Sequence, residues 1–377
     1  MSAIESEARN GGIDALRGGS ILLVIVHHLA LGFRLPLGPS WLGEWLPARL
    51  IGVLSYSGYA AVYCFFVISG FLITRRLMLR YGDLRCIELR RFYRDRASRI
   101  LPLLLALLLV LSVLHGLGVP GYVIQQPGQS LGGAWLAALG LHLNWYEGQT
   151  TWLPGSWDVL WSLSIEELYY LIFPLACLLL PRPLLLLSLG ALVLSLPWTR
   201  AALDGQEIWQ EKAYLPAMSA IAVGVLAAQA TQWPASRGYA RCLLAIGVAV
   251  LLACLACAGE LWRATGHASL LVIAGASALV LLGCDWLQAP APPGLGWLAR
   301  MGRLSYELYL THMFVVLTVV ALWHALLGDA QPRWNFLPYL PALLVCVALA
   351  AAVERYYSKP CERWLRRRSA GLSRAGL

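Results

Sequence analysis

Long apolar runs separated by short polar segments repeat along the whole chain. Ten of them are long enough for membrane helices, because about 20 apolar residues of helix cross a hydrocarbon core of roughly 30 Å. They centre on residues 18–34, 53–74, 100–118, 157–180, 183–199, 213–230, 240–258, 266–286, 303–326 and 336–356. The pattern predicts an all-α, polytopic membrane bundle of about ten transmembrane helices.

One further apolar run, at 131–143, is short and glycine-rich. It fits either an eleventh span or a short re-entrant or interfacial segment. If it does not cross and the N-terminus is cytoplasmic, 23 of the 29 lysines and arginines lie on the cytoplasmic side and 6 outside. If it crosses, the division becomes 15 and 14. The positive-inside rule therefore favours ten spans with both termini in the cytoplasm.

The composition agrees with a membrane protein. Only 13% of the 377 residues are charged and 59% are hydrophobic, whereas soluble proteins carry roughly 25% charged residues. The net charge of +9 comes from short segments between apolar runs, which indicates membrane lipids rather than nucleic acid as a partner. We expect one transmembrane domain over 1–377, ending in a short basic tail at about 357–377.

The nine cysteines give no sign of a disulfide framework. Cys254 and Cys257 form a CxxC, but it lies within an apolar run, where thiols are buried and unreactive. We therefore expect no metal site.

The first span carries ionisable residues at both ends. Asp14 and Arg17 stand at its start, and His27 and His28 lie deep in its apolar run. Arg17 and His28 are eleven residues apart, which places them on one helix face with a rise of roughly 16 Å between them. Ionisable groups inside a span are costly, so their default interpretation is functional.

The segment from Arg75 to Arg99 contains nine arginines. Arg96 and Arg99 are three residues apart and share a helix face. The segment fits two roles. It could set topology and contact anionic lipids, or its guanidinium groups could bind a phosphate-bearing ligand from the cytoplasm.

The fourth span contains Glu166 and Glu167 within an apolar helix. A buried carboxylate there fits either catalysis or hydrogen bonding between helices. The outer segment before it, at 119–156, is rich in tryptophan, which fits an interfacial belt or a sugar-stacking surface. The outer loop at 200–212 is another candidate for acceptor contacts.

The ninth span places Ser305, Tyr309 and His312 near one helix face, given their spacings of four and three. His312 fits a structural histidine that forms a hydrogen bond between helices, or a substrate contact.

Four stretches in this order resemble the membrane acyltransferase family 3. The first is Ile13-Asp14-x-Leu16-Arg17 followed by His28, and the second is 65–73, with sequence FFVISGFLI. The third is Arg96-x-x-Arg99-Ile100-x-Pro102, and the fourth is 161–166, with sequence WSLSIE. The segment from Ser305 to His312 is a weaker fifth match.

This resemblance implies roles for particular residues. His28 would be the catalytic histidine, with Glu166 and Arg17 as further catalytic residues. Arg96, Arg99 and Arg17 would bind the phosphates of acetyl-CoA or another acyl-CoA. The expected substrate contacts are Ser69, Trp161, Tyr170 and His312. Many relatives have a histidine two residues before the motif tryptophan, where this chain has Val159.

The resemblance also implies an activity, namely O-acyl transfer, with acetyl as the expected group, from cytoplasmic acyl-CoA to an acceptor hydroxyl. His28 would act as general base or as a transient acyl carrier, and Glu166 would orient or stabilise its imidazole. We expect a surface glycan or its lipid-linked precursor as acceptor, and a lipophilic metabolite such as a macrolide is the alternative. A bacterial inner membrane is the expected location.

The family often appends an SGNH hydrolase-like domain, and this chain, which ends about twenty residues after its last span, is similar to the stand-alone branch. A proton-coupled or glycan transporter is the rival class, because it would use the same buried residue types. The absence of an internal repeat and the one-sided arginine cluster argue against it. A receptor or scaffold would leave Glu166 and His28 unexplained.

Overall fold

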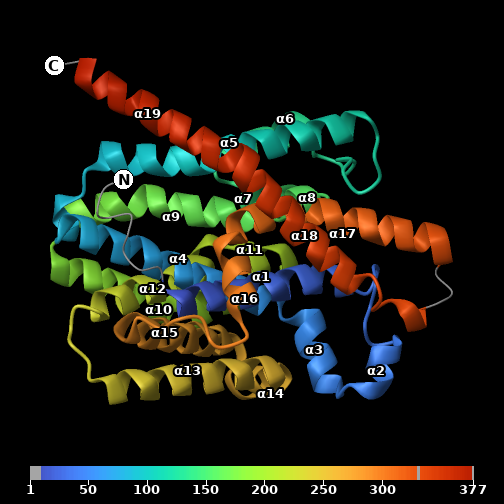
Figure 1. The fold of residues 1–377 in the computed structure, drawn as a ribbon, viewed down its shortest axis with the longest axis horizontal. Coiled ribbons are helices and arrows are strands. Elements are labelled where there is room, and N and C mark those ends of the chain that lie inside the picture. The colour runs from blue at the N-terminus through green and yellow to red at the C-terminus, as the bar shows by residue number, and fades with distance from the viewer. Residues whose placement is uncertain (1–9, 329–331, 376–377) are drawn as a thin grey trace.

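The computed structural model describes residues 10–328 and 332–375, with side chains up to 368. Every regular element in this part of the chain is helical, and ten helices are long and apolar enough to cross a membrane. The helices lie side by side, and α1 begins at the same end of the bundle at which α19 finishes (Figure 1). The predicted all-α membrane bundle of ten spans is confirmed.

Each predicted span corresponds to one long helix. These are α1 (Gly11–Ala30), α4 (Gly58–Tyr81), α5 (Leu89–Gly116), α9 (Leu160–Leu179), α10 (Arg182–Ala201), α12 (Tyr214–Ala230), α13 (Arg237–Ala256), α15 (Ser269–Leu287), α17 (Ser305–Leu327) and α18 (Tyr339–Val353).

The remaining α-helices extend the spans or connect them. They are α2 (Trp41–Trp45), α3 (Ala48–Tyr56), α6 (Leu131–Leu139), α7 (Leu143–Thr150), α8 (Gly155–Asp158), α11 (Glu207–Lys212), α14 (Ala258–Thr265), α16 (Gly296–Arg303) and α19 (Lys359–Ala375). One π-helical turn, Glu354–Ser358, joins α18 to α19.

The predicted basic tail is therefore helical, because α19 continues α18 beyond the bundle (Figure 1). Residues 376 and 377 of that tail lie outside the described residues. Helix α5 begins eleven residues before its predicted span, so the Arg-rich stretch that carries Arg96 and Arg99 is helical as well.

The segment 131–143 does not cross. Its helix α6 has nine residues, about 14 Å of helix, which is less than half of a hydrocarbon core. Helices α6 and α7 pack against each other and against α9. The segment 119–156 is thus a folded cap on the bundle.

Glycines allow the closest helix crossings. A Cβ on Gly70 of α4 would lie 2.0 Å from the Ile221 carbonyl oxygen of α12, and one on Gly224 would lie 1.9 Å from the Val67 carbonyl oxygen. The two backbones therefore touch, as is typical of membrane helix pairs. This contact fixes α4, which carries Ser69, in the centre of the bundle.

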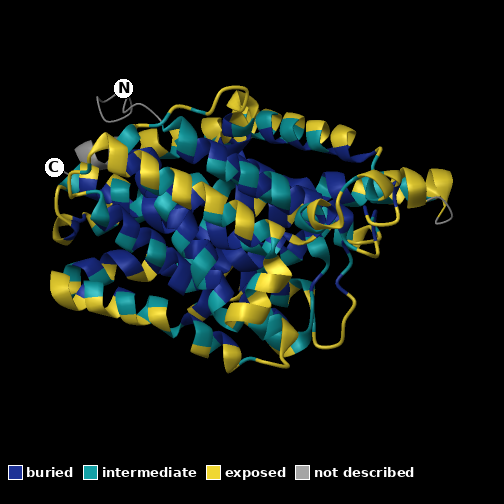
Figure 2. Cartoon of the chain, turned by 90° about the horizontal axis from the view of Figure 1, so that it is seen from below, coloured by how far each residue is buried: buried dark blue, intermediate teal, exposed yellow. Residues whose placement is uncertain are grey.

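The outside of the bundle is apolar. Buried residues concentrate in the middle, and exposed ones lie on the periphery (Figure 2). Helices α10 and α13 expose large aliphatic side chains, such as Leu187 (68%), Leu194 (64%) and Leu252 (61%). Such surfaces face lipid in a membrane protein.

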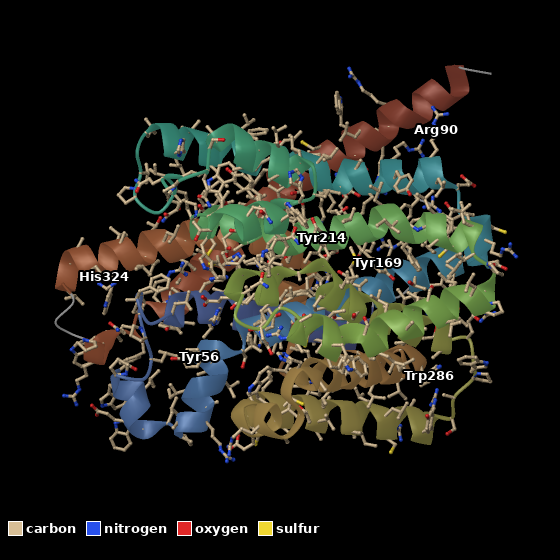
Figure 3. All side chains as sticks on the ribbon, turned by 180° about the vertical axis from the view of Figure 1, so that it is seen from behind. Tyr56, Arg90, Tyr169, Tyr214, Trp286 and His324 are labelled. Atoms are coloured by element: carbon tan, nitrogen blue, oxygen red, sulfur yellow. The ribbon has the colours of Figure 1, made fainter. Side chains whose placement is uncertain are left out.

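The two ends of the bundle differ. Arg90, in the arginine-rich segment, lies at the end toward which α19 runs, and His324, near the end of α17, lies at the opposite end (Figure 3). We call the first of these the arginine end. We call the second the cap end, because the cap formed by α6 and α7 leads into α8 there.

Candidate active site

A cavity of about 140 Å³ opens between α1, α4, α5, α9 and α17. Four arginines line it, together with aliphatic and aromatic side chains and several hydroxyls. Its polar wall consists of Arg17, Ser69, Arg76, Arg96, Arg99, Ser162, Glu166, Tyr170, Ser305, Tyr306 and Tyr309. A mixed lining of this kind is typical of small-molecule sites.

Arg96 is paired with carboxylates inside the cavity wall. Its Nε donates to both oxygens of Glu167 at 2.9 and 3.1 Å, and its terminal nitrogen Nη2 contacts Glu167 and, at 3.1 Å, Oε1 of Glu166. Its guanidinium also lies 4.0 Å from the centre of the Tyr170 ring. Two carboxylates and an aromatic face thus hold Arg96.

Arg76 and Arg99 differ from Arg96. Neither makes a hydrogen bond or ion pair with any residue that the structure describes, and Arg76 is exposed at the cavity. Arg99, Arg96 and Arg366 are the cationic groups that act on Arg76 most strongly. Positive charges that face a cavity without carboxylate partners form a ready anion site.

Arg17 lies in the same wall, with its Nη2 donating to the Ser305 hydroxyl at 2.6 Å. The spacing on α1 thus brings Arg17 to the cavity. Arg76 was missed in the sequence. Its signal was present, since it belongs to the same arginine-rich segment, at the end of the neighbouring span α4.

The two histidines of α1 have different surroundings. His27 Nδ1 lies 2.7 Å from the Ser55 carbonyl oxygen, and a Cβ on Gly58 would lie 2.5 Å from its ring. His27 is therefore packed and bonded. His28 Nδ1 is buried without a partner among the described residues, and its ring centre lies 5.2 Å from that of His312.

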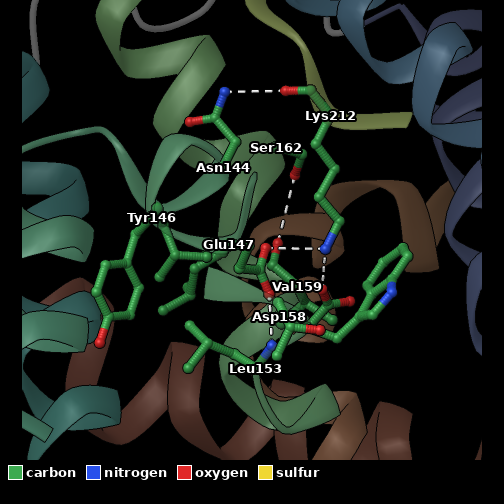
Figure 4. A network of polar contacts seen from close by, with 12 residues as sticks. Asn144, Tyr146, Glu147, Leu153, Asp158, Val159, Ser162 and Lys212 are labelled. Atoms are coloured by element: carbon green, nitrogen blue, oxygen red, sulfur yellow. Dashed lines mark hydrogen bonds and ion pairs between the residues drawn. The ribbon is translucent and has the colours of Figure 1, made fainter. Parts of the chain in front are cut away.

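A polar network joins the end of α11 to α7 and α8 (Figure 4). Lys212 Nζ lies 2.8 Å from Oε2 of Glu147 and pairs with Asp158, and its ammonium stands 4.0 Å from the centre of the Trp152 ring. Glu147 Oε1 accepts the Leu153 N–H at 3.0 Å. We call Lys212, Glu147 and Asp158 the cap triad.

Arg34 connects this region to the first span. Its Nη1 donates to the His28 carbonyl oxygen at 2.6 Å, so it caps the end of α1 beside the candidate catalytic residue. Burial lowers the pKa of Arg34 to about 10, and the nearby Asp158 carboxylate opposes that shift. Arg34 therefore stays protonated at neutral pH.

Burial, reinforced by the Asp158 charge, raises the pKa of Glu147 well above its ordinary value, although Lys212 acts in the opposite direction. The cap triad was not predicted from the sequence, because Glu147 and Lys212 lie in two separate polar segments and Asp158 falls at the start of the predicted fourth span.

The structure brings six of the predicted residues together at the cavity. They are Arg17, Ser69, Arg96, Arg99, Glu166 and Tyr170. Trp161 is not in the lining and packs edge-on against Phe66, with ring centres 6.0 Å apart. His28 and His312 face each other outside the lining, and Tyr309, one turn before His312, stands in the cavity wall.

The expected contact between Glu166 and the His28 imidazole is not formed. Among the described residues Glu166 accepts from the Ser69 hydroxyl at 2.8 Å and from Arg96. The guanidinium of Arg96 on the neighbouring helix α5 satisfies this carboxylate, and the spacing of the motifs in the sequence does not reveal that contact.

The chain is similar to known O-acetyltransferases. O-acetyltransferase OatA of Staphylococcus aureus strain NCTC 8325 / PS 47 is 31% identical over 170 residues, which is 44% of this chain and 24% of that relative. The OatA of strain MRSA252 matches equally. The chain thus matches about a quarter of the length of these relatives.

No solved structure matches the chain. Residues 10–354 match the profile of the acyltransferase 3 family, described as "Acyltransferase domain", which is nearly the whole of the bundle. The resemblance carried by the five motifs is confirmed, and this multi-pass membrane chain belongs to the acyltransferase 3 family.

Proposed function

We propose that the protein is a membrane O-acyltransferase that moves an acetyl group from acetyl-CoA to a hydroxyl of a surface glycan or its lipid-linked precursor. The observation that carries the proposal is the arginine-lined cavity, which opens at the arginine end and extends to Tyr309, one turn from His312 and its neighbour His28. The family and the names of its O-acetyltransferase relatives support the same reaction class.

The donor occupies this cavity. Arg76 and Arg99, which form no ion pair with a described carboxylate, bind its phosphates, and Arg17 stands farther along the wall. The apolar part of the lining, which includes Val62, Phe66 and Leu310, suits the pantetheine arm. Arg96 contributes by holding Glu166 and Glu167 rather than by binding phosphate.

His28 is the general base. It takes the proton from the acceptor hydroxyl as the new carbon–oxygen bond forms on the thioester carbonyl. The carbon–sulfur bond then breaks, its electron pair leaves on sulfur, and the imidazolium returns the proton to give free CoA.

The acceptor approaches from the cap end. Exposed Trp145 pairs edge-on with Trp209, with ring centres 5.1 Å apart, near Asn144 and the cap triad. Exposed aromatic rings beside polar groups suit a carbohydrate. With the arginine end in the cytoplasm, the bundle joins a cytoplasmic donor to an extracytoplasmic acceptor across a bacterial inner membrane.

The histidines of α1 supply the decisive experiment. Purified wild type, His28→Ala and His27→Ala are compared for CoA thiol release with acetyl-CoA and a soluble glycan acceptor. We expect His28→Ala to lose at least about 100-fold in turnover. His27→Ala should keep most of the turnover, because its ring contacts Ser55 and Gly58 away from the cavity.

Wild-type turnover by His28→Ala would refute the assignment. A transporter would release no thiol from acetyl-CoA in any variant, so the same measurement separates the two classes. Equal yield and monodispersity in detergent establish that both substituted proteins are folded.

A further inference from the structure

Two imidazoles from different helices meet deep in the bundle. The ring of His28 on α1 and the ring of His312 on α17 have centres 5.2 Å apart and planes inclined by 39°. This separation equals about one hydrogen-bond length of 2.9 Å plus the two ring radii. The rings are thus at the distance at which an N–H···N hydrogen bond can join them.

The hydrogen bonds of His312 determine which of its nitrogens carries a proton. Its Nδ1 lies 2.8 Å from the Tyr309 carbonyl oxygen and 3.1 Å from that of Leu308. Carbonyl oxygens only accept, so Nδ1 is the protonated nitrogen, and the neutral ring has its lone pair on Nε2. The residue is fully buried, and this Nε2 has no partner among the described residues.

His28, which faces His312, also has a ring nitrogen without a hydrogen-bond partner among the residues that the structure describes. Nδ1 of His28 is also buried and unpartnered within the described chain. A buried polar atom without a hydrogen bond costs roughly 1–3 kcal/mol. One proton on His28 Nδ1, directed at the lone pair on His312 Nε2, satisfies both atoms.

We propose that His312 is the positioning residue of the catalytic histidine. It accepts the Nδ1–H of His28, which fixes the tautomer and leaves Nε2 of His28 as the base that faces the acceptor hydroxyl. This is the part that the acid plays in a Ser-His-Asp triad. The inference rests on the proposed function and replaces Glu166, whose carboxylate is bound to Ser69 and Arg96.

The proton balance is simple. The proton of the acceptor hydroxyl moves to Nε2 of His28 and later to the departing thiolate. His312 keeps its own Nδ1 proton, which stays hydrogen-bonded to the Tyr309 carbonyl oxygen. The hydrogen bond to His312 strengthens when His28 becomes an imidazolium, so it stabilises the charged intermediate more than the ground state.

Other charged groups surround the pair. His312 itself has the largest charge effect on His28, followed by Arg34 and His27 on α1 and the loop after it, and by Lys212 at the end of α11. All four are basic, and each opposes the imidazolium when it carries a charge. His312 can favour the imidazolium only as the neutral ring, whose Nε2 lone pair accepts a hydrogen bond.

The test compares His312→Leu with His312→Gln in the full-length detergent-solubilised protein. Leucine removes the acceptor, whereas the glutamine side-chain oxygen can accept near the position of Nε2. We expect His312→Leu to lower kcat at least about 10-fold with little change in KM for acetyl-CoA. His312→Gln should recover most of that loss.

The pH–rate profile adds a readout that a purely structural role would not move. Without the acceptor the imidazolium is less favoured, so the acid limb of kcat/KM for His312→Leu should lie at lower pH than in wild type. Unchanged CoA affinity by calorimetry shows that the cavity is intact in both variants.

Three results would overturn the inference: full activity of His312→Leu, equal losses in both variants with an unmoved acid limb, or a displaced limb in Glu166→Gln but not in His312→Leu. Failure of the proposed function is distinct from these. It appears as wild-type turnover in His28→Ala, whatever the His312 variants do.

Discussion

The arginines that line the cavity fall into two groups according to whether they are paired with carboxylates, and membership of one sequence motif does not predict the group. Arg96 and Arg99 stand three apart on α5, yet Arg96 is held by Glu166 and Glu167, and Arg99 faces the cavity with Arg76. A guanidinium already bound to carboxylates has little left to offer a phosphate. The sequence spacing alone treats the two as equivalent.

CoA affinity tests this division. Arg99→Ala and Arg76→Ala should each weaken CoA binding about 10-fold, since one charge-assisted hydrogen bond contributes about 1.5 kcal/mol. Calorimetry in detergent measures the change. Arg90→Ala is the matched control, because Arg90 is exposed in the same segment and does not line the cavity.

Arg96→Ala should behave differently from Arg99→Ala. The Arg96→Ala substitution leaves Glu166 and Glu167 without their cation. We therefore expect its main effect to be a lower thermal midpoint, with a smaller change in CoA affinity. Equal CoA affinity in Arg90→Ala and Arg99→Ala, both below wild type, would instead indicate a general charge effect of the segment.

At the scale of elements, the hydrophobic pattern predicted nearly everything that length and polarity determine. Ten apolar runs became ten helices, and charge asymmetry identified 131–143 as a segment that does not cross. Apolar patterning does not show which helices touch. The neighbours of α4 depend on Gly70 and Gly224, and a glycine in an apolar run looks the same at a crossing as on a lipid face.

The same limit applies to the candidate site. Motif spacing brought six residues to one cavity, because each motif occupies one helix face. The pairing of His28 with His312, the exclusion of Trp161 and the cap triad depend on contacts between distant helices. No local pattern encodes such contacts, so they could not be predicted from one sequence.

The close crossing of α4 and α12 requires that residue 224 have no side chain, which a substitution can test. The new Cβ of Gly224→Ala would stand 1.9 Å from the Val67 carbonyl oxygen, so the helices must separate. We expect a loss of stability of about 1–3 kcal/mol, measured as a lower thermal midpoint in detergent.

Gly190→Ala is the matched control for that change. Gly190 lies within α10, and no heavy atom stands within 4 Å of its added Cβ. Alanine favours helix over glycine, so this variant should equal or slightly exceed wild type. A midpoint for Gly224→Ala as high as that of Gly190→Ala would mean that α4 and α12 do not cross closely.

At the scale of the whole molecule, the cap triad joins parts that lie far apart in the chain. Lys212 at the end of α11 holds Glu147 of α7 and Asp158 of α8 (Figure 4). Asp158 acts on Arg34, which holds the His28 carbonyl oxygen. The cap and the end of α1 are thereby tied into one body.

The protonation of Glu147 makes this connection sensitive to pH. Burial raises its pKa well above the ordinary 4.5, so above that pH the folded protein holds a proton that the unfolded chain releases. The stabilising contribution is therefore complete below about pH 4.5 and is lost as the pH rises through the folded value. In Glu147→Gln the neutral amide retains the acceptor for Leu153 and has no proton to lose.

Thermal midpoints of wild type and Glu147→Gln between about pH 5 and about pH 8 measure this effect. We expect the wild-type midpoint to fall relative to the variant as the pH rises, by a few degrees, because each pKa unit corresponds to about 1.4 kcal/mol. Glu207→Gln, at an exposed position on α11, should follow wild type throughout. Parallel curves for wild type and Glu147→Gln would show that Glu147 is already ionised beside Lys212, and the cap would then be held by a fully charged triad.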